Sequence, residues 1–104
     1  MITATKRKHP DHILLAVDYP RQDEIITSPT YTIRVFAPDG IARVGLSIDR
    51  GPWKSCREAV GYWWYDWSGY SSGEHQVVVS METPEGLRVI AEPHEFFVNL
   101  PKKR

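Results

Sequence analysis

The sequence contains one cysteine, Cys56, and that scarcity excludes two kinds of structure. A single thiol forms neither an intrachain disulfide nor a cysteine-based metal site. The sequence also lacks a run of 18 apolar residues, which a membrane-spanning helix needs, and polar residues follow Met1 where a signal peptide is apolar. We therefore expect a protein of the reducing cytoplasm without a membrane partner.

Net charge is also absent, because 13 basic residues balance 13 acidic ones. Six basic residues lie at the two ends, which leaves 7 basic and 13 acidic side chains in residues 9–100. Nucleic-acid-binding domains usually present a basic body or stripe, so this acidic body argues against a nucleic-acid partner. The basic segments 1–10 and 101–104 are predicted to be tails that flank one domain of residues 11–100.

Long helices are excluded as well, because eight prolines and seven glycines divide the chain into short segments. Within these segments apolar side chains recur with a period of two, which is typical of half-buried strands. The clearest positions are Ile33, Val35, Val44, Leu46, Val77 and Val79. Turn sequences such as Pro-Asp-Gly at 38–40 separate the runs. We predict an all-β fold, a single immunoglobulin-like antiparallel β-sandwich of about seven strands, in which only residues 53–62 have room for a brief helical turn.

The order of these segments resembles an immunoglobulin-like domain of the early-set type found in bacterial proteins. The resemblance runs from Ile13 to Val98 and rests on YTIRVFAPDGIARVGLSIDRGPW (31–53), YWWYDW (62–67) and GEHQVVVSMET (73–83). The C-terminal dimerisation domain of sulfite-oxidase-type enzymes has a similar layout. Because these motifs are structural, the resemblance implies a fold and no particular reaction.

A looser resemblance connects residues 33–49, IRVFAPDGIARVGLSID, to the opening of glycogen- and starch-binding sandwich modules. Phe36 stands where those modules carry tryptophan in Val-Trp-Ala-Pro. Residues 49–53, DRGPW, only partly match their Asn-x-Trp segment. The resemblance implies a carbohydrate as an alternative partner.

Three tryptophans and three tyrosines gather in GYWWYDWSGY, residues 61–70. On a strand, Trp63, Tyr65 and Trp67 share one face, and the residues between them share the other. One face is therefore expected in the core, and three interpretations of the other stay open: structural packing, a protein or homodimer interface, or a flat platform for a sugar ring. The predicted ligand- or partner-binding residues are Trp53, Tyr62, Trp64 and Tyr70.

No spacing of reactive residues predicts catalysis, a metal site or a cofactor. His9 and His12 would share a metal on a helix, but Pro10 interrupts that helix. Cys56 lacks a neighbouring histidine, and no phosphate-binding glycine motif is present. The sequence therefore predicts a non-catalytic module for protein–protein contact or self-association, with carbohydrate binding as the alternative.

Overall fold

The computed structural model describes residues 15–101, and every regular element in this part of the chain is a β-strand. The predicted tail of residues 1–10 lies outside the described residues, as do His12 and residues 102–104. The strands, in chain order, are β1 (Ala16–Tyr19), β2 (Ile25–Ile26), β3 (Thr30–Phe36), β4 (Arg43–Ile48), β5 (Trp53–Ser55), β6 (Arg57–Ala59), β7 (Tyr62–Ser68), β8 (Gly73–Glu82), β9 (Arg88–Ile90) and β10 (His94–Val98).

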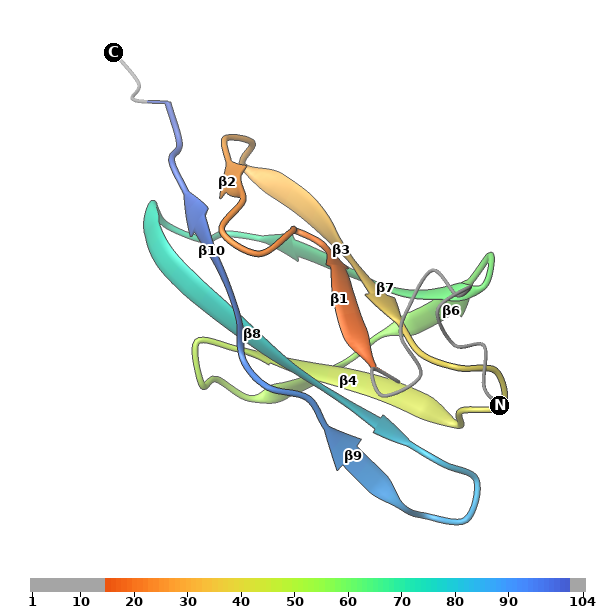
Figure 1. The fold of residues 1–104 in the computed structure, drawn as a ribbon. Helices are drawn as coiled ribbons and strands as arrows, with labels where there is room; N and C mark the ends of the chain where they lie inside the picture. The colour runs from red at the N-terminus through yellow and green to blue at the C-terminus, as the bar shows by residue number, and fades with distance from the viewer. Residues whose placement is uncertain (1–14, 102–104) are drawn as a thin grey trace, which may run out of the picture.

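The strands form two sheets, which face each other as a sandwich (Figure 1). Sheet A has the order β1-β3-β7-β6, and sheet B has the order β2-β10-β8-β4-β5, with β9 also paired to β8. An immunoglobulin-like sandwich is built in the same way, because its first, second, fifth and fourth strands form one sheet and its third, sixth and seventh strands form the other. The predicted all-β immunoglobulin-like fold is confirmed.

Two details differ from the sequence prediction. Residues 53–59 form two short strands and no helical turn, because β5 pairs with β4 of sheet B while β6 pairs with β7 of sheet A. Between these strands the Cys56 amide donates a hydrogen bond to the Val44 carbonyl oxygen at 2.9 Å, so the chain stays extended as it changes sheets. The short β2 runs parallel to β10, whereas the other strand pairs are antiparallel.

Strand β8, the longest strand, organises sheet B. One side of β8 pairs with β4, from Val77 to Glu82. The other side pairs with two strands in succession, since β10 lies along its first half and β9 lies along its second half. Residues 91–93 separate the two partners, so β9 continues along β8 where β10 leaves off (Figure 1).

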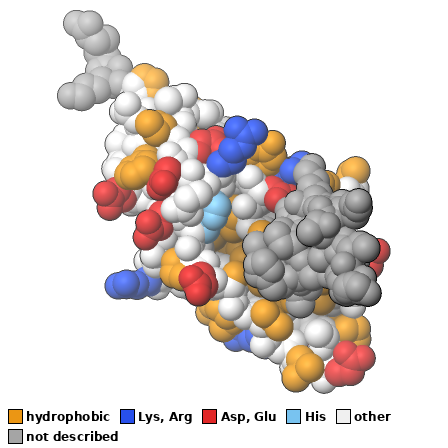
Figure 2. Space-filling view, viewed as in Figure 1, with side chains coloured by type: hydrophobic (Ala, Val, Ile, Leu, Met, Phe, Trp, Pro, Cys, Tyr) orange, Lys and Arg blue, Asp and Glu red, His pale blue; other side chains and the backbone are white. Residues whose placement is uncertain are grey.

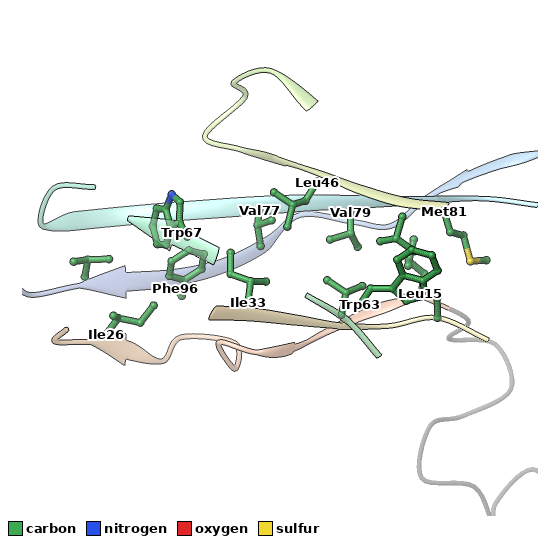
Figure 3. Packing of buried hydrophobic residues seen from close by; sticks show 14 residues of the cluster. Leu15, Ile26, Ile33, Leu46, Trp63, Trp67, Val77, Val79, Met81 and Phe96 are labelled. Carbon is green, nitrogen blue, oxygen red and sulfur yellow. The ribbon is translucent and has the colours of Figure 1, made fainter. Parts of the chain in front are cut away.

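The core fills the space between the inner faces of the sheets (Figure 3). Trp63 and Trp67 of β7 point inward with exposed fractions of 7% and 9%, and Tyr65 between them packs against the same core. One face of the aromatic run is therefore core, as predicted. The alternating positions of the other strands are buried as expected, namely Ile33, Val35, Val44, Leu46, Val77, Val79 and Met81.

One end of the core is a cluster of rings around Trp67. The Phe96 ring meets Trp67 edge-on at 5.5 Å, and the His75 ring stacks on Phe96 at 5.9 Å between centroids. The His75 ring is fixed from both sides, because Nε2 donates to the Ser71 carbonyl oxygen at 2.7 Å and Nδ1 lies 2.6 Å from Oδ2 of Asp49.

Replacing Phe96 with alanine should destabilise the protein by about 3–5 kcal/mol, because a fully buried ring leaves a cavity beside Trp67. The free energy of unfolding in urea measures this loss. The matched control is Phe97→Ala on the other face of the same strand, where the ring is only half-buried and the loss should be much smaller. Equal losses for the two variants would contradict the assigned inner face of β10.

Candidate functional site

The outer face of sheet A carries Tyr62 and Trp64, two of the predicted binding residues. Their ring planes meet at 71° with centroids 6.0 Å apart, so the pair does not present the flat surface on which a sugar ring stacks. The Trp64 indole N–H donates to the Ala59 carbonyl oxygen at 2.8 Å, which ties that ring to the neighbouring strand. The two rings therefore lie together but form no coplanar platform.

Arg34 lies over two tyrosine rings on this face. The Arg34 guanidinium lies over both Tyr62, at 4.1 Å, and Tyr19, at 4.7 Å, and its Nε is 3.3 Å from a carboxylate oxygen of Asp18. A cation over an aromatic face is attracted to the electron-rich ring, and more so where water is excluded. Arg34 thus covers part of the Tyr62 ring, one of the predicted binding residues, and part of the neighbouring Tyr19 ring.

A second ion pair lies on the same face. Arg57 of β6 donates to Asp66 of β7 at 2.9 Å, and the Thr32 hydroxyl also donates to Asp66 at 3.0 Å. The hydrogen bond from Arg57, followed by that from Thr32, lowers the pKa of the Asp66 carboxyl. These contacts link three neighbouring strands and leave Asp66 engaged as a structural acceptor.

Tyr70, another predicted binding residue, packs against the end of the core. Its ring stacks on Trp67 at 3.9 Å, and its hydroxyl donates to the Ser28 carbonyl oxygen at 2.6 Å. Burial raises the pKa of this phenol. Tyr70 therefore closes the ring cluster around Trp67 and lies apart from Tyr62 and Trp64.

Trp53 lies on the opposite sheet, with 45% of its surface exposed. Its indole lies across the outer face above Gly45, where an added Cβ would come within 3.8 Å of the indole and 3.1 Å of the Lys54 carbonyl oxygen. Arg88 of β9 reaches across β8 and β4, and its guanidinium carbon lies 4.7 Å from the centroid of the indole ring. Because Gly45 has no side chain, the indole of Trp53 can lie close to the backbone of the sheet where it meets Arg88.

A shallow groove of about 220 Å³ surrounds this contact. Its lining includes Ser80 and an ion pair between Arg43 Nε and Glu82 Oε1, which are 2.7 Å apart. The four predicted binding residues therefore occupy three places: Tyr62 and Trp64 outside sheet A, Tyr70 at the end of the core, and Trp53 in this groove. Their role in binding stays a prediction.

A feature that the sequence prediction missed lies beside the groove. Leu87, Val89 and Ile90 expose 69%, 40% and 55% of their surfaces on and next to β9. Hydrophobic side chains gather in the part of Figure 2 where Figure 1 places β9. The available signal was the run LRVI (87–90), in which apolar residues stand on both faces of a short strand. We call Trp53, Leu87, Arg88, Val89 and Ile90 the β9 surface.

Cys56, the single cysteine, is a half-buried free thiol that packs against the core. Burial raises the pKa of the Cys56 thiol to about 12, and the charge of Arg57 only partly opposes this effect, so the thiol stays protonated at neutral pH. Within residues 15–101, no three His, Cys, Asp or Glu side chains are grouped to hold a metal ion. The same part of the chain contains no helix long and apolar enough to cross a membrane.

Comparison with known proteins shows the fold. No family model and no curated protein matches the chain. Solved structures of fibronectin(III)-like modules of Clostridium thermocellum CbhA match 81% of this chain and 93% of the module, at 14% identity and a TM-score of 0.68. An engineered protein matches 83% of the chain at 18% identity and a TM-score of 0.68, and a modular endo-β-1,4-mannanase from Cellulomonas fimi matches 82% at 17% identity and 0.64.

The matched regions are 20% of the engineered protein and 18% of the mannanase, so this chain spans about a fifth of the length of each. At such identities the likeness concerns the fold alone. The chain has the immunoglobulin-like sandwich fold of fibronectin(III)-like modules.

Cys56 should react slowly with thiol reagents in the folded protein. A pKa of about 12 instead of 9.0 leaves, at pH 8, a thiolate fraction about a thousandfold below that of an ordinary thiol. The measurement is the rate of reaction with a disulfide reagent at pH 8, with and without urea. A folded-state rate close to the rate in urea would contradict the packing of the thiol against the core.

Proposed function

We propose that the protein is a non-catalytic interaction module and that it contacts a protein partner through the β9 surface. The observation that carries the proposal is the concentration of exposed apolar side chains. Among the described residues, six large hydrophobic side chains are exposed, and four of them belong to the β9 surface: Trp53, Leu87, Val89 and Ile90.

Clustering of this kind is more informative than exposure of single residues. Isolated apolar side chains are normal on soluble proteins, whereas exposed apolar side chains that gather at one place are typical of an interface. On β9 they lie on both faces of the strand, Leu87 and Val89 on one and Ile90 on the other. The charged side chains of Arg43, Glu82 and Arg88 line the groove on the Ile90 face. Tryptophan and arginine are also the residues that most often dominate binding energy at protein interfaces.

The chemistry of the remaining side chains supports a role without catalysis. The Cys56 thiol is held in its protonated form by burial, and His75 is engaged by Asp49 and by the Ser71 carbonyl group. The fold is shared with fibronectin(III)-like modules. The sequence resemblance to the dimerisation domain of sulfite-oxidase-type enzymes supports association, and the single cysteine supports a reducing, cytoplasmic location.

Site-specific photo-crosslinking tests the contact surface. A photoreactive benzoyl-phenylalanine at position 87 should give a crosslinked product in cells that produce the protein, because Leu87 lies on the β9 surface. The matched control places the same group at Val60, which is even more exposed, at 88%, and lies in the turn before β7. Products at both positions alike, or at neither, would argue against the β9 surface.

A carbohydrate-binding function is the second candidate, and the open face of Trp53 beside Arg43 and Glu82 favours it. Sugar rings stack on exposed indoles while hydroxyl groups bind charged side chains at the rim. Titration with soluble starch and β-1,4-linked oligosaccharides should then give a saturable change in tryptophan emission that Trp53→Phe abolishes and Trp64→Phe preserves. An unchanged emission would remove this candidate.

A further inference from the structure

Among the residues that the structure describes, strand β9 has one unpaired edge. Within residues 15–101 it pairs only with β8. The hydrogen bonds that flank the strand run from the Ala91 amide to the Val79 carbonyl oxygen and from the Thr83 amide to the Leu87 carbonyl oxygen. Backbone groups point alternately to the two sides of a strand, so residues 87, 89 and 91 face β8. The amide and carbonyl groups of Arg88 and Ile90 therefore face outward.

The other sheet edges are protected in ordinary ways. Edge strands avoid unwanted pairing when they are very short or carry charged side chains. Strand β2 has two residues, β5 and β6 carry exposed charged side chains (Lys54, and Arg57 with Glu58), and β1 exposes no large apolar side chain. Among the edge strands of the described chain, β9 combines three residues with two exposed apolar side chains, Val89 and Ile90.

Arg88, the charged residue of β9, does not place its charge beside the free edge of the strand. The Arg88 guanidinium lies 4.7 Å from the Trp53 ring centroid, and Trp53 belongs to β5, on the far side of β8 and β4. This cation–π contact holds the guanidinium of Arg88 over the sheet, away from the unpaired edge of β9. The exposed backbone groups are left beside apolar side chains.

We propose that β9 binds a second copy of this chain, edge to edge and antiparallel, with the two-fold axis at Val89. The proposal rests on the interaction function proposed above and names its partner. In this register Arg88 of one copy lies opposite Ile90 of the other, and their outward amide and carbonyl groups form two hydrogen bonds. Symmetry repeats this pair, which gives four hydrogen bonds.

The side chains of the segment are self-complementary in this register. On one face Leu87 lies opposite Ala91, and Val89 lies opposite its own symmetry mate, so the facing pairs are apolar. On the other face Arg88 lies opposite Ile90, and no like charges meet directly from residue 85 to residue 93. An axis at Ile90 would instead use the backbone of Glu92, which lies beyond the last residue of the strand.

Two variants of opposite charge test the proposal directly. The Val89 side chains face each other across the axis in a non-hydrogen-bonded pair, where side chains are closest. Val89→Lys and Val89→Glu should each weaken self-association about tenfold or more, because like charges then meet at the axis, whereas a 1:1 mixture should recover it to within about threefold of the original. Sedimentation equilibrium up to about 1 mM protein covers the range of small, transient interfaces.

Two control pairs use the same substitutions elsewhere. Ile25 lies on edge strand β2 with 60% of its surface exposed, and its Lys and Glu variants should leave self-association unchanged. Ile90→Lys and Ile90→Glu should show no gain on mixing, because position 90 faces position 88. Recovery on mixing the Ile90 variants in place of the Val89 variants would overturn the register.

A protein that stays monomeric at about 1 mM, beyond the range of small transient interfaces, would overturn the second copy as the partner. The crosslinking at position 87 separates this failure from failure of the proposed function. A product with a different protein, with no product of twice the chain's mass, keeps the interaction function and overturns self-association. Absence of any crosslinked product at position 87 would overturn both the proposed interaction function and the proposed self-association.

Discussion

The packing of Trp63 and Trp67 against the inner face of sheet B is the contact on which the rest of the structure depends. Both rings come from one strand, so the alternation of that strand sends Tyr62 and Trp64 to the opposite face. A single aromatic run therefore supplies the bulk of one core layer and the rings on the outside of sheet A. The same strand thus accounts for aromatic residues on both sides of sheet A.

Arginine organises the outer faces of both sheets. Arg34 lies over Tyr19 and Tyr62 on sheet A, and Arg88 lies over Trp53 on sheet B. In each case the cation lies over an aromatic ring, which holds its charge close to the sheet surface. On sheet B the same contact separates the charge of Arg88 from the free edge of its own strand. The contact with Trp53 thus leaves Val89 and Ile90 as the exposed side chains of β9 nearest its free edge.

The sequence predicts what depends on local alternation and misses what depends on contacts across the sheets. The inward positions of β3, β4 and β8, such as Ile33, Leu46 and Val79, could be predicted because a half-buried strand repeats every two residues. The position of Trp53 depends on Gly45 of β4, which leaves room for the indole, and on Arg88 of β9, which contacts it. No local sequence pattern predicts these contacts between strands. The free edge of β9 could not be predicted either. The chain continues from β9 into β10, which pairs with the other half of β8 and does not pair with β9.

The central claim is that the outward backbone groups of Arg88 and Ile90 bind another strand. Amide hydrogen exchange measured by NMR at two protein concentrations, about 10 μM and about 1 mM, tests it most directly, since these span tight to transient association. Exchange at these two amides should slow at the higher concentration, while the amide of Ser55, which faces away from β4 on edge strand β5, should exchange at an unchanged rate. Rates at Arg88 and Ile90 that do not depend on concentration would contradict it.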